Sequence, residues 1–341
     1  MATRIAVDAM GGDDAPDVVV AGTLQAIQEA DDPIEVILFG PESQVQSAID
    51  AHGDLGAAAR ATHVVDAPDV IGMGEAPAAA VKKKQSSSIH YGLNAHKKGD
   101  VDAFVSAGNT GAIMAASIFI LGRIAGVERP SIAGYFPNLK GSSIVLDIGS
   151  NVDCKPSHLV QFARMGSVYA RAVHANEQPS VGLLNIGEEP GKGNDQVKAA
   201  YELLQEADDI HFKGNVEGQD LLFYAADIII CDGFVGNILL KFGETMTTVL
   251  SEMTSQEMDR QGLSPKERKL VAGVLGEVRK GFDPEGRGGA PLLGVNGNVL
   301  IGHGRSTADA VSEMIQFGVH LAGHDVTHTI ESAFASREAP S

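Results

Sequence analysis

Six short apolar runs alternate with segments of helical length, and this alternation limits the possible fold more than any other feature of the sequence. The runs are rich in valine, isoleucine, leucine and alanine, as in strands buried on both faces of a sheet. Strands that alternate with helices form βαβ units, which build a mostly parallel sheet covered by helices on both faces. We therefore expect an α/β fold in three layers. The strands are expected at 4–9, 34–40, 101–106, 142–148, 180–186 and 226–232, and the helices at 17–31, 75–98, 110–124, 157–175, 194–207 and 234–258.

Composition and charge exclude several classes of protein. Of the 341 residues, 44% are hydrophobic, so the chain can bury a large core and is not expected to be disordered. There is no uninterrupted apolar stretch of roughly 18 residues, so we expect neither a transmembrane helix nor a signal peptide. The two cysteines, Cys154 and Cys231, form no CxxC pair, which argues against a disulfide framework or a cysteine-rich zinc site. The net charge of −18 argues against a nucleic-acid-binding protein, and it requires local positive charge wherever an anionic substrate binds.

Five loops that follow expected strands are rich in glycine, asparagine, aspartate and lysine. In open α/β sheets, ligands bind beyond the carboxyl ends of the strands. Five such loops at one edge therefore predict a binding site more strongly than any one loop alone. Their sequences are AMGGDDAP (9–16), AGNTGA (107–112), GSNVDCKP (149–156), GEEPGKGN (187–194) and DGFVGN (232–237).

The stretch SAGNTGA at 106–112 joins an expected strand to a helix that begins near Thr110. The first N–H groups of a helix are unpaired and carry partial positive charge, which suits a phosphate. Gly108 and Gly111 would let the backbone approach such an anion, and Asn109 and Thr110 can donate from their side chains. The alternative is that Asn109 or Thr110 simply caps the helix. Neither a Walker A loop nor a GxGxxG motif occurs, so a nucleotide cofactor is not expected.

Two further loops carry candidate catalytic groups. Lys192 lies between two glycines, directly before a helix that Asn194 would cap, and it can pair with a phosphate or polarise a carbonyl. It can equally be part of a solvated surface loop. Asp232 ends a strand and can orient a reacting group or cap the next helix, in which Asn237 lies one turn further on.

Other chemical groups along the chain each have a simpler interpretation. Cys154, next to Lys155, is a possible nucleophile, although a free cysteine more often serves only in packing. Residues 286–306 predict a β-hairpin with an Asn-Gly turn and then a helix start, where His303, Gly304 and Ser306 offer an anion contact or ordinary capping. The histidines of the last helix recur at helical spacing, but no carboxylate joins them at zinc spacing, so no metal is expected. They are His320, His324 and His328.

Lysines cluster in two places, and in so acidic a chain these clusters stand out. They are Lys82, Lys83 and Lys84 in one segment and Lys97 and Lys98 in the next. Each cluster is either a solvated helix segment or a docking site for an acidic partner.

Residues 234–282 break the alternation, because two long helical patterns follow each other directly. Gly262 ends the first, and Ser264, Pro265 and Glu267 are typical of the start of the second. Such a hairpin carries more apolar surface than its two helices need for each other. We expect this surface to lie on a partner subunit, on a membrane surface, or on both. The residues expected to contact a membrane are Leu270, Val271, Val274 and Leu275.

Several long strings occur in an order that resembles the bacterial phosphate acyltransferases of phospholipid synthesis. They include VDAMGGDDAP, SAGNTGA, LDIGSNVDCKPSHLVQFARMGSVYA, VGLLNIGEEPGKGN, GNVEGQD, CDGFVGNILLK and GGAPLLGV, and the resemblance runs from about residue 4 to about residue 330. It implies a fold related to phosphotransacetylases and isocitrate-dehydrogenase-like enzymes. We expect one catalytic domain over 1–335, with the hairpin 234–282 inserted in it. The string HGRS at 303–306 departs from the pattern, because a small residue is expected in place of Arg305.

The resemblance also implies an activity and its partners. The expected reaction is attack of inorganic phosphate on the thioester of an acyl carrier protein, which gives acyl phosphate and free carrier protein. The implied enzyme is a cytoplasmic homodimer that visits the inner face of the cell membrane and passes its product to a membrane glycerol-3-phosphate acyltransferase. No cofactor is implied. A cysteine acyltransferase that works through Cys154 and a non-catalytic membrane scaffold are the rival hypotheses.

The candidate site residues fall into two groups. Lys192, Asp232 and Asn237 are the expected catalytic residues. Residues expected to bind phosphate or substrate are Asp8, Gly12, Ser106, Asn109, Thr110, Gly111, Lys155, Asn194 and His303.

Overall fold

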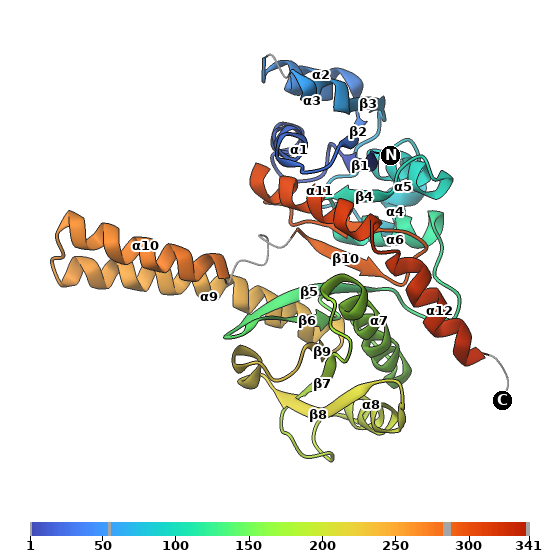
Figure 1. Ribbon diagram of the computed structural model, residues 1–341, viewed down its shortest axis with the longest axis vertical. Helices are drawn as coiled ribbons and strands as arrows, with labels where there is room; N and C mark the ends of the chain where they lie inside the picture. The colour runs from blue at the N-terminus through green and yellow to red at the C-terminus, as the bar shows by residue number, and fades with distance from the viewer. Residues whose placement is uncertain (1, 54–55, 282–287, 339–341) are drawn as a thin grey trace. The chain divides into compact units, whose positions relative to one another are not determined.

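The computed structural model describes residues 2–53, 56–281 and 288–338 (Figure 1). The chain divides into two compact units. The first unit comprises Met1–Ala133, Val168–Glu177 and Glu285–Ser341, and the second comprises Gly134–Ser167 and Gln178–Pro284. The expectation of a single catalytic domain over residues 1–335 stays a prediction.

The strands of the first unit follow the order β3-β2-β1-β4-β11-β10. Neighbours from β3 to β11 pair in parallel, whereas β10 runs antiparallel to β11 and to the start of β5. The β10–β11 pair confirms the predicted hairpin, with Asn296 and Gly297 in its turn; residues 286 and 287 lie outside the described residues. The strands are β1 (Thr3–Asp8), β2 (Ile34–Gly40), β3 (Thr62–Asp66), β4 (Ala103–Ser106), β10 (Ala290–Leu293) and β11 (Val299–Ile301), with β5 at Ser131–Asn138.

Helices cover both faces of this sheet, which confirms the three-layer prediction for the first unit. One group contains α1 and α11, which pack on each other, with α1 on β2 and α11 on β1, and the other contains α4, α5 and α6 (Figure 1). The single helix predicted at 75–98 is wrong: two helices form, because Ser87 caps α5 by accepting a hydrogen bond from the His90 N–H at 3.4 Å. The helices are α1 (Asp17–Glu29), α2 (Glu42–Asp50), α3 (Ala57–Ala61), α4 (Pro77–Lys83), α5 (Ser88–Lys98), α6 (Thr110–Ile120), α11 (Ala308–Ala322) and α12 (Val326–Glu338).

The second unit has the strand order β5-β6-β9-β7-β8, in which β6, β9, β7 and β8 pair in parallel. Its core includes Phe136, Val145, Val216, Leu221 and Ile229. The strands are β6 (Gly141–Leu146), β7 (Ser180–Asn185), β8 (His211–Glu217) and β9 (Ile228–Ile230). The helices are α7 (Pro156–His174), which begins in this unit, α8 (Asp195–Glu206) and the short 3-10 helix η1 (Asp220–Phe223).

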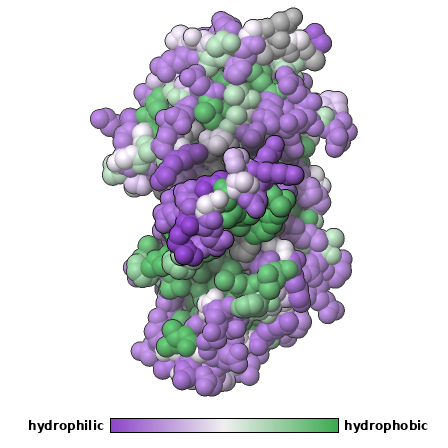
Figure 2. Space-filling view, turned by 90° about the vertical axis from the view of Figure 1, so that its left-hand side faces the viewer, coloured by the Kyte–Doolittle hydropathy of each residue, from purple (hydrophilic) through white to green (hydrophobic). Residues whose placement is uncertain are grey.

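The predicted helical hairpin is present as α9 (Gly233–Arg260) and α10 (Pro265–Gly281); residue 282 lies outside the described residues (Figure 1). Ser264 and Glu267 form the expected capping box, since both the Ser264 N–H and its hydroxyl donate to Glu267 Oε2 at 2.8 and 2.6 Å. Apolar side chains are exposed along both helices. Figure 2, which views the hairpin from its tip, shows hydrophobic surface beside hydrophilic surface. The exposed apolar side chains are Phe234, Val235, Ile238, Phe242, Met246, Val249, Leu250 and Met253 on α9, and Leu270, Val274 and Val278 on α10.

Two of the four residues expected to contact a membrane belong to this exposed set. Leu270 and Val274 are 69% and 60% exposed, whereas Val271 and Leu275 are half-buried. Over the described residues, no helix combines the length and the hydropathy that crossing a bilayer requires.

Candidate functional site

Three neighbouring strands of the first unit end at one edge of its sheet. β1, β4 and β11 are parallel and adjacent, so the loops that follow them, 9–16, 107–109 and 302–307, lie side by side. Helices α6 and α11 begin directly after two of these loops. Unpaired helix N–H groups and backbone loops of this kind favour an anion. This edge of the first unit is therefore a candidate anion site.

Asp8 and Ser106, at the ends of β1 and β4, tie two of these loops together. Both side chains are buried, and the Ser106 hydroxyl donates to Asp8 Oδ2 at 2.6 Å. The Gly108 N–H in turn donates to Ser106 Oγ at 3.0 Å. A Cβ at Gly11 would lie 2.8 Å from both Asp8 Oδ2 and the Gly108 nitrogen, so only glycine fits there. Asp8 and Ser106 therefore hold together the loops that follow β1 and β4.

Burial raises the pKa of the Asp8 carboxyl above its ordinary value of 3.8, while hydrogen bonds from Ser106, Ser88 and Met10 oppose that shift. The folded protein therefore keeps this proton at pH values where the unfolded chain has lost it. Stability linked to Asp8 is fully present below the ordinary pKa and falls as the pH rises through the raised pKa.

We expect the Asp8→Asn variant, which cannot ionise, to gain free energy of unfolding relative to the wild type as the pH rises above 3.8, the ordinary pKa of this carboxyl. Urea unfolding of both proteins at several pH values measures the difference in their free energies of unfolding. The contributions of other titrating groups cancel in this difference because both proteins contain them. A difference that stays constant with pH would contradict the assignment.

Both polar ends of the Asn109 side chain are already occupied by the protein. Its Oδ1 accepts from the Ala112 N–H at 3.1 Å, which caps α6. Its Nδ2 group lies within hydrogen-bond distance of three carbonyl oxygens of the preceding loop, those of Gly72 at 3.3 Å, Met73 at 3.0 Å and Glu75 at 3.0 Å. This geometry favours the capping alternative for Asn109. Thr110, directly after it, is exposed, and Gly111 lies against Pro77, where a Cβ would come within 2.6 Å.

We expect Asn109→Ala to lower the free energy of unfolding by more than the ~1 kcal/mol typical of losing a helix cap. The excess arises because the variant also loses the side-chain donor to the loop of residues 72–75. Asn194→Ala is the matched control, since Asn194 caps α8 by accepting from the Val197 N–H at 2.9 Å and lies exposed. Denaturant unfolding of the two variants makes the comparison; equal losses would show that the loop contacts of Asn109 add nothing.

A backbone hydrogen bond joins the loop 302–307 to the loop 9–16. The Asp13 N–H donates to the Gly304 carbonyl at 2.7 Å, and the Ser306 N–H and hydroxyl both donate to the His303 carbonyl. Gly12 has a φ of +120°, a conformation that favours glycine. A hollow of about 10 Å³ between these loops has room for about one water, so a phosphate would have to meet their outer surface.

The second unit has its own edge of this kind. β6, β9 and β7 are adjacent and parallel, so the loops 147–155, 231–232 and 186–194 that follow them lie side by side. The five predicted loops thus form two sets, one in each unit, and the loop at 302–307 joins the set of the first unit.

The centre of the second edge is Asp147, which we did not predict as a site residue. Its buried carboxylate accepts hydrogen bonds from the backbone of Gly149, Ser150 and Asn151 and from the side chains of Ser150 and Asn151. Burial raises its pKa, and these donors oppose that shift. The sequence signal was present, since an aspartate at a strand end followed within a few residues by Gly-Ser-Asn, here after Ile148, is typical of a turn that bonds to its own backbone.

The predicted residues of this edge are mostly caps or exposed groups. Asp232 caps α9, because its Oδ1 accepts from the Val235 N–H at 2.8 Å. Asn237 lies beside Gly149, and Lys155 is exposed. The Lys192 ammonium is half-exposed, with Glu189 Oε2 at 3.9 Å, and Asn185 Nδ2 holds the Lys192 carbonyl at 3.1 Å. Lys192 is thus a cation on a loop whose backbone is fixed.

Both cysteines are at least partly buried. Cys154 is half-buried and its Sγ donates to the Asn151 carbonyl at 3.4 Å. Burial raises the pKa of the Cys231 thiol well above its ordinary value. Within the described ranges, no three histidine, cysteine, aspartate or glutamate side chains are grouped so as to hold a metal ion.

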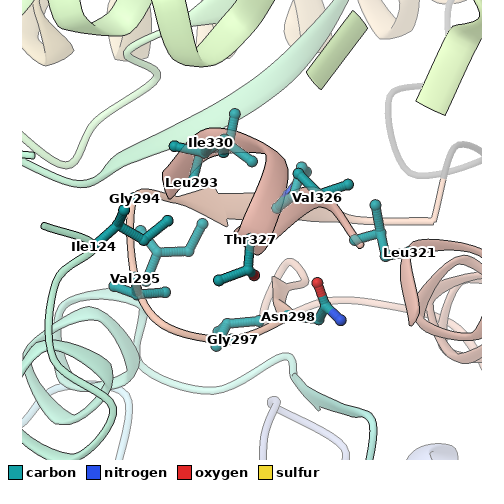
Figure 3. Close-up of a pocket in the computed structure, with 13 residues that line it drawn as sticks. Ile124, Leu293, Gly294, Val295, Gly297, Asn298, Leu321, Val326, Thr327 and Ile330 are labelled. Atoms are coloured by element: carbon teal, nitrogen blue, oxygen red, sulfur yellow. The ribbon is translucent and has the colours of Figure 1, made fainter. Parts of the chain in front are cut away.

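A cavity of about 20 Å³ lies elsewhere in the first unit, at the amino end of β11 (Figure 3). Its lining is mainly apolar and includes Ile124, Val295, Leu321 and Ile330. This is the end of the strand opposite to the loop that carries His303. The position and the small volume both argue against a substrate site there.

Solved structures define the class of fold to which the chain belongs. A phosphotransacetylase from Streptococcus pyogenes superposes with a TM-score of 0.61 at 17% identity, covering 94% of each chain. A phosphotransacetylase from Staphylococcus aureus gives a TM-score of 0.57 at 17% identity, covering 96% of this chain and 94% of that chain. The fold is therefore that of the phosphotransacetylases, as predicted.

Sequence comparison defines the family. The pattern of a family described as "fatty acid synthesis protein" matches residues 3–329. The phosphate acyltransferase of Salinibacter ruber is 68% identical over 338 residues, 99% of each chain, and that of Chlorobaculum parvum is 46% identical over 334 residues, covering 96% of this chain and 97% of the relative. The chain belongs to this family of phosphate acyltransferases, and it is an acyltransferase enzyme.

Proposed function

We propose that the enzyme transfers the acyl group of an acyl carrier protein to inorganic phosphate, and that the acyl phosphate serves phosphatidic acid synthesis. A phosphate oxygen attacks the thioester carbonyl carbon, the C–S bond breaks, and the carrier protein leaves with its sulfur as a thiol. The single observation that carries the proposal is the edge of the first unit, where three glycine-rich loops and the start of α6 lie together. Family membership supports the same reaction, because its relatives are named phosphate acyltransferases.

The start of α6 offers hydrogen-bond donors and partial positive charge to the phosphate. Inorganic phosphate carries up to two negative charges and is a weak nucleophile, so it must be held and aimed. Backbone N–H groups at Thr110 and Gly111, fixed in place by the Asn109 cap, would hold it through hydrogen bonds and the helix dipole. Positioning of this kind contributes ~7–11 kcal/mol to lowering a barrier.

Lys192 is the proposed cation for the developing charge. In our proposal its ammonium stabilises the oxyanion formed at the thioester carbonyl, a contribution of ~3–4 kcal/mol for one good donor. Asp232 and Asn237 are proposed to orient the reacting groups. Asn194 holds the start of α8, and Lys155 and His303 are proposed to contact the substrate. The route needs no covalent enzyme intermediate and no cofactor.

The test of the route compares direct attack with a covalent cysteine intermediate. Purified enzyme is given palmitoyl carrier protein and phosphate, and acyl phosphate is trapped with hydroxylamine as the hydroxamate. We expect phosphate-dependent product from both the wild type and a Cys154→Ala variant. An inactive but folded Cys154→Ala variant, or a palmitoylated enzyme in the absence of phosphate, would replace direct attack by the cysteine route.

We further propose that the exposed apolar stripe of the hairpin contacts a second copy of the chain and the inner face of the cell membrane. This stripe consists of the exposed apolar side chains of α9 and α10 named above, and exposed apolar surface gathered in this way marks an interaction site. Lys266 and Lys269 on α10 are exposed and would add attraction to anionic lipids. Such a position would let the acyl phosphate pass to a membrane glycerol-3-phosphate acyltransferase.

We expect the double variant Val274→Asp/Val278→Asp to float with phosphatidylglycerol vesicles at least about tenfold less than the wild type. Ala272→Asp/Gly276→Asp is the matched control, because these exposed residues lie on the other side of α10. Undiminished flotation of the stripe variant would remove the membrane contact from the proposal. Light scattering on the same proteins tests the dimer, since a wild-type monomer would remove that part.

A further inference from the structure

We propose that the last turn of α4, with Lys82 and Lys83, is the docking site for the acidic protein that carries the acyl thioester. The inference rests on the proposed function, in which an acyl carrier protein is the substrate. It adds the surface that such a protein recognises.

The position of α4 next to the candidate phosphate site is the first argument. α4 packs against α6, and its first residue, Pro77, lies against Gly111 in the first turn of α6. The loop that leads into α4 is held by Asn109, whose side chain lies within hydrogen-bond distance of three of its carbonyl oxygens. Packing and hydrogen bonds therefore hold α4 beside the start of α6. A protein docked on α4 would have its thioester arm close to the helix start that we propose for phosphate.

The charges of the three consecutive lysines are the second argument. Lys84 is used internally, because its ammonium bonds to Glu75 and to the Val70 carbonyl. Lys82 and Lys83 are exposed, and neither has a salt bridge to any residue that the structure describes. Glu75, which pairs with Lys84, also feels the charge of Lys83, so these two lysines share one acidic neighbour. In a chain with 26 basic and 44 acidic residues, three consecutive cations beside one carboxylate leave a local positive charge.

The groups around Lys82 and Lys83 determine from which side an acidic protein can approach the site. The loop 9–16 carries the exposed carboxylates Asp13 and Asp14, which disfavour an acidic partner on that side of the site, whereas the loop 302–307 carries one exposed cation, Arg305. Met73, in the loop before α4, is 43% exposed, and its methyl group lies against Gly304, where a Cβ would come within 2.6 Å. An apolar contact thus lies at the rim of the site, beside the basic turn. A docking site for a carrier protein is expected to combine charge that attracts the protein with an apolar surface that contacts its thioester arm.

The test reverses the charges of Lys82 and Lys83 and compares a carrier-protein substrate, which must dock, with a small thioester, which need not. For Lys82→Glu/Lys83→Glu we expect the KM for palmitoyl carrier protein to rise at least about tenfold, with loss of most of its salt dependence. The KM and kcat for a small thioester, S-acyl-N-acetylcysteamine, should stay unchanged, because that substrate has no protein to dock. The matched control is Lys97→Glu/Lys98→Glu on the exposed end of α5, which makes the same change in net charge and should leave both substrates unaffected.

The outcomes distinguish this inference from the proposed function. If the wild type makes acyl phosphate and the α4 variant keeps its KM for the carrier protein, the docking site is wrong and the reaction stands. An equal rise in KM in the α5 control would show a general charge effect and would also overturn the site. If the wild type makes no acyl phosphate, direct binding of palmitoyl carrier protein by fluorescence anisotropy decides: weaker binding by the α4 variant alone supports the site, and equal binding overturns it.

Discussion

Replacing Gly236 with alanine is expected to lower the free energy of unfolding by at least about 3 kcal/mol. Gly236 lies in the first turn of α9, directly against the loop that follows β6. A Cβ at this position would lie 1.8 Å from the Asp147 carbonyl oxygen and 3.0 Å from Cys231 Sγ. The backbone carbonyl cannot turn away, because Asp147 is buried and its side chain is fixed by the loop 149–151. Denaturant unfolding followed by circular dichroism measures the loss.

Gly276→Ala provides the matched control for this variant. Gly276 also lies within a helix, α10, but nothing surrounds its Cβ position within 4 Å. Alanine should therefore stabilise α10 by ~0.5–1 kcal/mol through its helix propensity. Equal denaturation midpoints for the two variants would show that the contact between Gly236 and Asp147 does not constrain the fold.

Replacing Lys192 with alanine is expected to lower kcat more than tenfold while the fold survives. The loss of activity follows from the proposed role of the ammonium in stabilising the oxyanion, where removal of one donor costs ~3–4 kcal/mol. The fold should survive because Lys192 is half-exposed and its nearest carboxylate, Glu189, is 3.9 Å away. Surface pairs of this kind contribute little to stability. Steady-state kinetics with palmitoyl carrier protein and phosphate, together with the thermal midpoint, measure both effects.

Lys198→Ala separates the role of Lys192 from the general loss of a positive charge in this region. Lys198 lies exposed on α8, which begins directly after the Lys192 loop, and nothing assigns it to the reaction. Its replacement should leave kcat unchanged. A fully active Lys192→Ala protein would remove Lys192 from the mechanism.

The strands that are buried on both faces could be predicted from the sequence, because such strands are continuous apolar runs. β2, β4, β7 and β9 lie within the predicted runs, and β1 and β6 begin one residue before theirs. β3 and β8 were missed, since they are the outermost strands in the order and mix exposed polar side chains with buried ones. β5 was missed because Gly134 and Pro137 interrupt its pattern.

Site prediction from sequence placed the loops but could not assign the side chains within them. Asparagine before a helix fits a phosphate contact as well as a cap, and only the contacts of Asn109 with Ala112 and with the loop 72–75 favour the cap. Asp147 was counted as the end of a strand, whereas it organises the following loop through its carboxylate. Both roles depend on which donors the folded chain brings within reach, and sequence spacing does not contain that information.

The central claim is that phosphate itself attacks the thioester. The most direct measurement gives the purified enzyme palmitoyl carrier protein and ¹⁸O-labelled phosphate, and follows carrier thiol and labelled acyl phosphate together. We predict equimolar release of both, with ¹⁸O in the oxygen that bridges the acyl carbon and phosphorus, and no thiol release without phosphate. Thiol release at the same rate without phosphate, or acyl phosphate with an unlabelled bridging oxygen, would contradict it.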